Sequence, residues 1–295
     1  MAGTFLVAMA VVLRVIFNPL ANVYQKQLGL KGNNPLIVNF FSYLLLAAFS
    51  TILLIFVDTS NSGRDFWLYS TLGGIAGAMG NGFLVRALQM GDLSVLGPIN
   101  SYKSVIGIIV GIFLLSEIPN VWGIAGIALI IYGSYYVLDT TDEKFSWKLL
   151  RTPAIQYRIW AMVLTAIEAV FIKRVILVSS TTLAFVSWCI FGAFFSFIIL
   201  FFYKIRLKTE LRRTVKLEYL SKFLLLVACI GIMQFTTNYV FDHMPVGYAL
   251  SLFQLSIIVS VLFGYKFFQE KDIGKKIIGS VIMIVGSVMI ILLKN

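Results

Sequence analysis

Four polar residues recur at intervals of four within the first apolar stretch of the chain: Arg14, Asn18, Asn22 and Lys26. Residues four apart lie on one face of an α-helix, so these side chains form a single stripe. A guanidinium, two amides and an ammonium group can bind the anionic or hydrogen-bonding groups of a solute. Because a face this polar is costly in lipid, we expect it to face protein or water.

Two more charged residues, Lys103 and Glu168, lie deep inside other apolar stretches. Charges near the centre of a bilayer cost several kcal/mol and usually face a cavity or a partner. Arginine grips a carboxylate or phosphate bidentately and lysine binds it as a point charge. Arg14 and Lys103 against one carboxylate therefore favour a solute with an anionic group, although an Arg14–Glu168 bridge is a structural alternative. Glu168 would then pair with a substrate amine or carry a proton coupled to transport.

Other polar side chains within apolar stretches complete the candidate set. Gln234 and Asn238 repeat the spacing of four on a later stretch. Amides in membrane helices also bridge neighbouring helices, so that structural role is the alternative for each of them. The predicted substrate-binding residues are Arg14, Asn18, Asn22, Asn81, Tyr102, Lys103, Glu168, Gln234, Asn238 and Gln254.

The sequence lacks the residues that metal, covalent or ATP-driven chemistry needs. It has one histidine and two cysteines, and no His/Cys/Asp cluster has the spacing of metal ligands. No Gly-rich segment ends in the Lys-Ser or Lys-Thr of a nucleotide-binding loop. We therefore expect no metal, no cofactor, no enzymatic activity and no nucleic-acid partner. An intramembrane lipid-modifying enzyme is the weakest alternative, because it would need a nucleophile, a base or a metal.

The composition around these residues is that of a membrane protein. Of the 295 residues, 59% are hydrophobic and 13% are charged, against about 45–50% and about 25% in soluble domains. Uncharged runs such as 32–57 and 175–203 exceed the roughly 20 residues that span a bilayer, and a spanning run of this kind must be helical. We predict an all-α protein with ten transmembrane helices, near 4–27, 34–57, 67–90, 94–116, 119–138, 155–178, 181–203, 221–243, 247–268 and 273–293.

The first half of the chain repeats in the second half at an offset of 153. Residues 111–134 share seven identities with 264–287, where biased composition alone would give about two. Five helices is an odd number, so the second half must be inverted in the membrane. We divide the chain into a first repeat at 1–140, a connecting loop at 141–154 and a second repeat at 155–295. Glu117 and Glu270 occupy equivalent places, and each is expected to favour the positive dipole of the following helix.

The distribution of polar residues separates the predicted helices into two groups. The first, third, fourth, sixth, eighth and ninth carry the polar side chains and are expected to line a central cavity. The second, fifth, seventh and tenth are almost wholly apolar, so we expect them to face lipid or buttress the bundle.

Several short motifs resemble the EamA-type repeat of the drug/metabolite transporter superfamily. In the first half these motifs are Ala87-Leu88-Gln89, Gly97-Pro98, Leu115-Ser116-Glu117-Ile118-Pro119, Gly126 and Gly133. The second half carries a weaker copy in Phe268-Gln269-Glu270, Gly279 and Gly286, and has Ser251 where Pro98 stands. The resemblance implies a multi-pass secondary transporter of the cell membrane that moves a small organic metabolite by alternating access, with export favoured over uptake. A channel or a scaffold protein is the alternative.

The basic residues indicate how the helices are oriented. The net charge is +11, and the loops after odd-numbered helices carry 18 Lys and Arg, counting Arg158, against 4 on the other side. The positive-inside rule then places the odd-numbered loops in the cytoplasm and both termini outside. The resemblance implies the opposite, with both termini inside, so the orientation stays open between the two.

Overall fold

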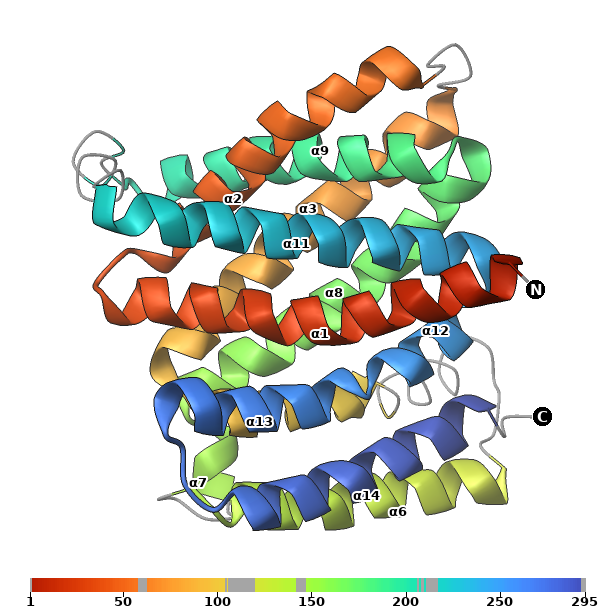
Figure 1. Ribbon diagram of the computed structural model, residues 1–295. Helices are drawn as coiled ribbons and strands as arrows, with labels where there is room; N and C mark the ends of the chain where they lie inside the picture. Colours follow the sequence, from red (N-terminus) through yellow and green to blue (C-terminus); the bar gives the residue numbers. More distant parts are fainter. Residues whose placement is uncertain are drawn as a thin grey trace.

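Within the described part of the chain every regular element is a helix (Figure 1). The computed structural model describes residues 2–57, 63–103, 105, 120–141, 147–205, 207, 210 and 217–292. The elements are α1 (Ala2–Leu30), α2 (Pro35–Ser50), η1 (Thr51–Phe56), α3 (Arg64–Met90), α4 (Leu93–Leu96), η2 (Pro98–Ser101), α6 (Val121–Leu138), α7 (Trp147–Leu150), α8 (Pro153–Val178), α9 (Thr181–Phe202), α11 (Leu217–His243), α12 (Val246–Phe253), α13 (Ser256–Phe268) and α14 (Ile273–Leu292).

Seven helical stretches among the described residues are long and apolar enough to cross a membrane. Helices α3 and α8 have similar lengths, 27 and 26 residues, but are not among these seven. Most of the fourth predicted span, 94–116, lies outside the described residues. The all-α membrane architecture is thus confirmed, whereas the number ten stays a prediction.

Side-chain caps explain where several of these helices begin. Asn34 accepts a hydrogen bond from the backbone amide of Leu36, and Pro35 occupies the first turn of α2. Ser180 caps α9 in the same way, and Asn120 caps α6. Such caps satisfy amide groups that have no partner inside the helix, and proline is tolerated in the first turn because it lacks that amide.

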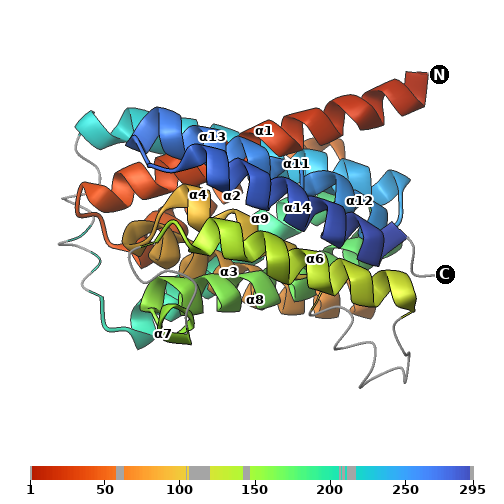
Figure 2. The same ribbon diagram turned by 90° about the horizontal axis from the view of Figure 1, so that it is seen from below.

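Both ends of the chain lie at one end of the helix bundle (Figures 1 and 2). The described parts of the connections after α1, α3, α6, α9 and α13 gather at the opposite end and carry basic residues such as Lys31, Arg151, Lys204 and Lys271. We call this opposite end the basic end. It comprises the described residues 31–34, 91–92, 139–141, 147–152, 203–205 and 269–272.

The helix pairing has the symmetry expected of an inverted repeat. In the order of the predicted spans, α1 and α3 are the first and third helices of one half, and α8 and α11 are those of the other. The structure packs α3 along α8 and α1 along α11. It also pairs α2 with α9 and α6 with α14, each with its own counterpart. A two-fold axis in the membrane plane produces this pattern of exchanged and self-paired helices.

Four glycines make the crossing of α6 and α14 possible. A Cβ atom on Gly126 would stand 2.6 Å from the carbonyl oxygen of Gly286, and one on Gly133 would stand 2.6 Å from that of Gly279. The offset of 153 relates Gly126 to Gly279 and Gly133 to Gly286, so the two contacts are exchanged by the repeat symmetry. Small residues one or two turns apart let helix backbones approach this closely in a membrane.

Two of the predicted spans contain a break in the helix. Helix α4 ends at Leu96, and Gly97 and Pro98 lead into the 3-10 turn η2. Helix α12 ends at Phe253, and Gln254 and Leu255 separate it from α13. Proline cannot donate the backbone hydrogen bond that would continue a helix. Interrupted helices of this kind commonly line solute sites in transporters built from inverted repeats.

Candidate functional site

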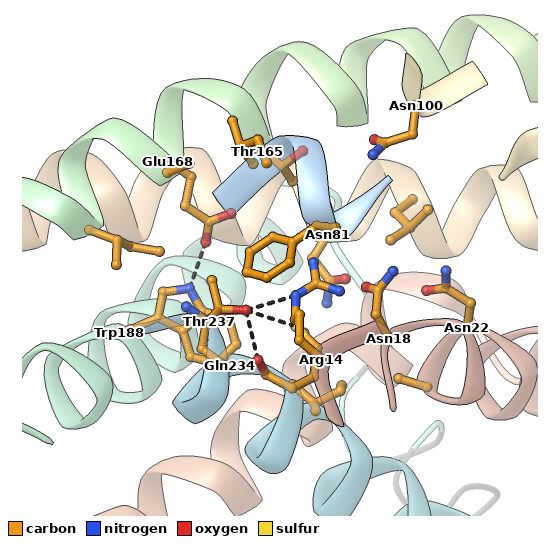
Figure 3. Close-up of a pocket in the computed structure, with 18 of the residues that line it drawn as sticks. Arg14, Asn18, Asn22, Asn81, Asn100, Thr165, Glu168, Trp188, Gln234 and Thr237 are labelled. Carbon is orange, nitrogen blue, oxygen red and sulfur yellow. Dashed lines mark hydrogen bonds between the residues drawn. The ribbon is translucent and has the colours of Figure 1, made fainter. Parts of the chain in front are cut away.

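A cavity of about 140 Å³ lies between the two halves of the chain. Figure 3 shows Arg14, Asn18 and Asn22 in succession along α1, with Glu168 and Trp188 across the cavity. Its described lining consists of Arg14, Asn18, Ala21, Asn22, Gln25, Tyr43, Asn81, Leu84, Asn100, Lys103, Arg158, Thr165, Glu168, Ala169, Ile172, Trp188, Ile230, Met233, Gln234, Thr237, Phe241, Leu250 and Phe253.

Arg14 is fixed in place but retains unused hydrogen-bonding capacity. Its Nε donates to Thr237 Oγ1 on α11 at 2.7 Å, and its guanidinium carbon lies 4.9 Å from the ring centroid of Phe253 on α12. These contacts hold the planar group at a set angle, because cations are attracted to aromatic faces. Its Nη1 atom is buried and has no hydrogen-bond partner in the described structure. This nitrogen therefore keeps a hydrogen-bond donor that no described residue uses.

Glu168 is a buried carboxylate, 8% exposed, on the middle of α8. Its Oε1 accepts a hydrogen bond of 2.6 Å from the indole Nε1 of Trp188 on α9. A Cβ atom on Gly77 of α3 would collide with this carboxylate, so the glycine creates the space that Glu168 occupies. The carboxylate is thereby oriented from two helices while it still lines the cavity.

Three cations line the cavity: Arg14, Lys103 and Arg158. Arg158 Nε donates to the carbonyl oxygen of Leu96 at 2.7 Å, where α4 ends. Lys103 forms no hydrogen bond or ion pair with a described residue, and none of the three lies within 4.0 Å of a described carboxylate oxygen. The described lining thus combines three positive charges with the single negative charge of Glu168. The bridge between Arg14 and Glu168 that the sequence allowed is not formed.

Asn81 on α3 belongs to a chain of amide hydrogen bonds beside the cavity. It accepts from Gln25 of α1 at 3.3 Å and donates to Asn39 of α2 at 2.6 Å. Asn39 in turn donates to the carbonyl of Ala78 and to Ser196 of α9. This network joins four helices, so Asn81 has both the bridging role and a place on the cavity wall.

The structure brings seven of the ten predicted site residues to the cavity wall and directs three elsewhere. The seven are Arg14, Asn18, Asn22, Asn81, Lys103, Glu168 and Gln234. Tyr102 donates to Ser134 at 2.8 Å on α6, and Gln254 donates to Ser287 at 3.1 Å on α14. Asn238 is fully buried, and its amide pairs with that of Gln234 (2.9 Å). Tyr102 and Gln254 thus bridge neighbouring helices, whereas Asn238 pairs within α11.

The sequence analysis missed several lining residues. Arg158 was counted with the basic loops, yet it is 8% exposed and lines the cavity. The second and seventh predicted helices were assigned to lipid or support, but α2 supplies Tyr43 and α9 supplies Trp188. No described residue of α6 or α14 lines the cavity, in agreement with their assigned supporting role. The available signal was that Arg158 already lies inside the predicted span 155–178.

Comparisons with known proteins agree with this architecture. The sequence matches the family model described as the EamA-like transporter family over residues 5–138 and 152–292. No curated protein matches the sequence. Among solved structures, one described only as the crystal structure of a protein aligns with a TM-score of 0.65. It is 16% identical, over 99% of this chain and 97% of that one, so it shows a shared fold alone.

Proposed function

Because the chain belongs to the EamA-like transporter family, we propose that it is a secondary carrier that moves a small organic solute with an anionic group. The observation that carries this proposal is the excess of unpaired cations in the cavity between the halves. Unpaired charges inside a bilayer are costly, and a bound carboxylate or phosphate would offset part of that cost. Inverted-repeat carriers bind solutes near mid-membrane and work by alternating access.

Arg14 and Lys103, two of the three cavity cations without an ionic partner among the described residues, have complementary binding properties. Arg14 can offer its unused Nη1 donor to one oxygen of an anion, and the guanidinium is well suited to a planar carboxylate. Lys103 can add a second, non-directional charge. The amides of Asn18, Asn22 and Gln234 line the same space and can bind polar groups on the rest of the solute.

We assign Glu168 to ion coupling, because it is the carboxylate of the described lining. A proton on Glu168 would remove the negative charge that competes with the anionic solute for the cations. Glu168→Gln should then abolish the pH dependence of transport and leave solute binding at low pH intact. If the variant instead loses only solutes that carry an amine, Glu168 pairs with that amine and the coupling role is wrong. The family analogy favours export as the direction.

A ligand-stabilisation screen followed by transport tests the proposal. Purified protein is heated with matched pairs of solutes, each acid or phosphate beside its neutral ester or alcohol. The charged member of a pair should stabilise the protein against heat. The same solute should show saturable counterflow in proteoliposomes, a behaviour that a channel or a scaffold protein would not give. Arg14→Gln and Lys103→Met should each weaken binding roughly 10- to 100-fold, from the typical strength of hydrogen bonds to charged groups.

The matched control is Arg86→Gln, because Arg86 is an exposed arginine of α3 that does not line the cavity. It should bind and transport like the wild type. Unchanged binding in both cavity variants, or equal stabilisation by the charged and neutral solutes, would contradict the proposal.

A further inference from the structure

One buried ion pair lies outside the cavity, at the basic end, and joins the two halves of the chain. Lys26 Nζ of α1 lies 2.9 Å from Glu270 Oε1, and their side chains are only 8% and 4% exposed. Lys26 also donates to the carbonyl of Gly91 at 2.8 Å and lies 4.7 Å from the ring centroid of Phe268. It is the fourth member of the polar stripe on α1, but it points into this cluster instead of the cavity.

Glu270 also holds the start of the interrupted span. Its two carboxylate oxygens accept hydrogen bonds of 2.8 Å from the backbone amides of Leu93 and Ser94. The carboxylate therefore binds the first turn of α4, in the other half of the chain, and the expectation that it serves the following helix is wrong. Lys276, 2% exposed, completes the cluster through Ser94 Oγ at 2.8 Å.

Apolar residues pack next to this ionic cluster. A buried cluster of apolar residues joins Val23 of α1, Leu88 of α3, Leu93 and Leu96 of α4, and packs against Phe268. Leu84 packs against the same cluster and also lines the cavity. Close packing is required as well, because a Cβ atom on Gly97 would stand 2.8 Å from Ser260 Cβ of α13. The ion pair and these packed residues join the two halves of the chain at the basic end.

The equivalent position in the second half is bonded differently. Before the second span the repeat offset is roughly 147 instead of 153, and it places Lys173 where Lys26 stands. Lys173 donates to the carbonyl of Phe241 within its own half. It forms no ion pair with a described residue. Glu117, the counterpart of Glu270, lies outside the described residues. Among the described residues, the lysine–carboxylate link between the halves therefore exists at the basic end alone.

We infer that Glu270 is the positioning residue that closes the basic end of the solute path, and that its bonds to Lys26 and α4 must release before the cavity opens there. The inference rests on the carrier function proposed above. Lys26 and the first turn of α4 belong to the first half, and Glu270 belongs to the second. Any rocking of one half against the other that opens this end must separate these groups.

Thiol labelling of the cavity from each side of the membrane tests the inference without a known solute. Cys189 and Cys229 are replaced by alanine, and Asn18→Cys provides a reporter on the cavity wall. A membrane-impermeant anionic methanethiosulfonate is applied to sealed vesicles of each orientation. In the same background, Lys271→Cys in the exposed α13–α14 connection identifies the vesicles whose basic end faces the reagent.

We expect Glu270→Gln to raise the labelling rate of Asn18→Cys from the basic end severalfold and to lower it from the opposite side. The matched control is Asp139→Asn, because Asp139 forms a more exposed pair with Lys275 (3.6 Å) at the same end. It should leave both rates unchanged. Lys26→Met is a second opening variant that can replace Glu270→Gln if the latter does not fold.

A merely structural role would lower thermal stability without changing the side from which the cavity is labelled. Unchanged labelling from the basic end in both Glu270→Gln and Lys26→Met would overturn the inference, as would an equal increase in Asp139→Asn. A failure of the proposed function is distinguishable, because it would show as absent counterflow in the wild type whatever the labelling pattern.

Discussion

Replacing Gly279 by alanine should destabilise the protein by separating α6 from α14. The added Cβ would stand 2.5 Å from the carbonyl oxygen of Gly133 and 2.9 Å from Tyr136 Cβ and Val137 Cγ2. The Gly133 oxygen belongs to the backbone and the Tyr136 Cβ is bonded directly to it, so neither atom can move unless α6 moves. Overpacking of this kind costs roughly 1–3 kcal/mol.

The same helix offers a matched control. Gly274 lies in the first turn of α14, and a Cβ there would meet nothing within 4 Å. Alanine is favoured over glycine in a helix by about 1 kcal/mol, and this gain applies to both variants. Gly274→Ala should therefore be neutral or stabilising, and the free energies of unfolding of the two variants should differ by about 1–3 kcal/mol.

The assay is denaturant-induced unfolding of the purified protein in mixed micelles, with helicity as the signal. Because no described residue of α14 lines the cavity, ligand binding below the unfolding transition should be unchanged in Gly279→Ala. Equal stability of the two variants would refute the close crossing of α6 and α14, and with it this part of the repeat symmetry.

Two further predictions concern buried carboxylates. Trp188→Phe removes the hydrogen-bond donor to Glu168 at 2.6 Å and should lower the free energy of unfolding by about 1–3 kcal/mol. The control Trp160→Phe changes an exposed indole and should leave the stability unchanged. Equal effects of the two variants in the same unfolding assay would contradict the role of this bond. Glu270 lies between α13 and α14: burial raises its pKa, but Lys26 and the hydrogen bonds from Ser94 outweigh this, and its pKa falls below the ordinary value of 4.5. A carboxylate with a lowered folded-state pKa stabilises the protein above its unfolded pKa, and this contribution is lost as the pH falls through the folded value. When unfolding is measured from neutral pH to below pH 4.5, the wild type should lose stability that Glu270→Gln does not lose. Equal pH profiles of the two proteins would contradict this role of the Glu270 carboxylate.

Helix positions and the repeat could be predicted from the sequence because lipid leaves few choices. The predicted spans 67–90 and 181–203 correspond to α3 (Arg64–Met90) and α9 (Thr181–Phe202), since a mostly apolar run of this length must be helical in lipid. The offset of 153 also identified the four glycines at the crossing of α6 and α14. It could not say which glycine faces which, because that depends on the antiparallel packing of the two helices.

The composition of the cavity wall was harder to predict where a helix is interrupted. Arg14, Asn18 and Asn22 follow from a regular stripe on one continuous helix. Tyr102 follows the break at Gly97 and Pro98, and Gln254 lies in the break between α12 and α13. A break resets the helical phase, so sequence spacing no longer fixes the direction of a side chain.

The remaining differences between the predicted and the observed contacts result from tertiary packing. Arg158 and Trp188 reach the cavity because α8 and α9 turn those faces inward, although one lies near a loop and the other in an apolar helix. Glu270 binds Leu93 and Ser94 of the other half, a partner about 177 residues away in sequence. The residues that surround Glu270 in the sequence do not show whether its carboxylate binds the helix that follows it or a helix of the other half.

The most direct test of the central claim measures the electrostatic sign of the cavity. In a protein with Cys189→Ala and Cys229→Ala, Asn18→Cys is reacted with an anionic and with a cationic methanethiosulfonate, and each rate is divided by that of a free thiol. An excess of cations around the cavity predicts that the anionic reagent is favoured roughly tenfold or more, and that adding Lys103→Met reduces this preference. A cysteine that reacts with neither reagent, or reacts faster with the cationic one, would contradict a wet, positively charged cavity between the two halves.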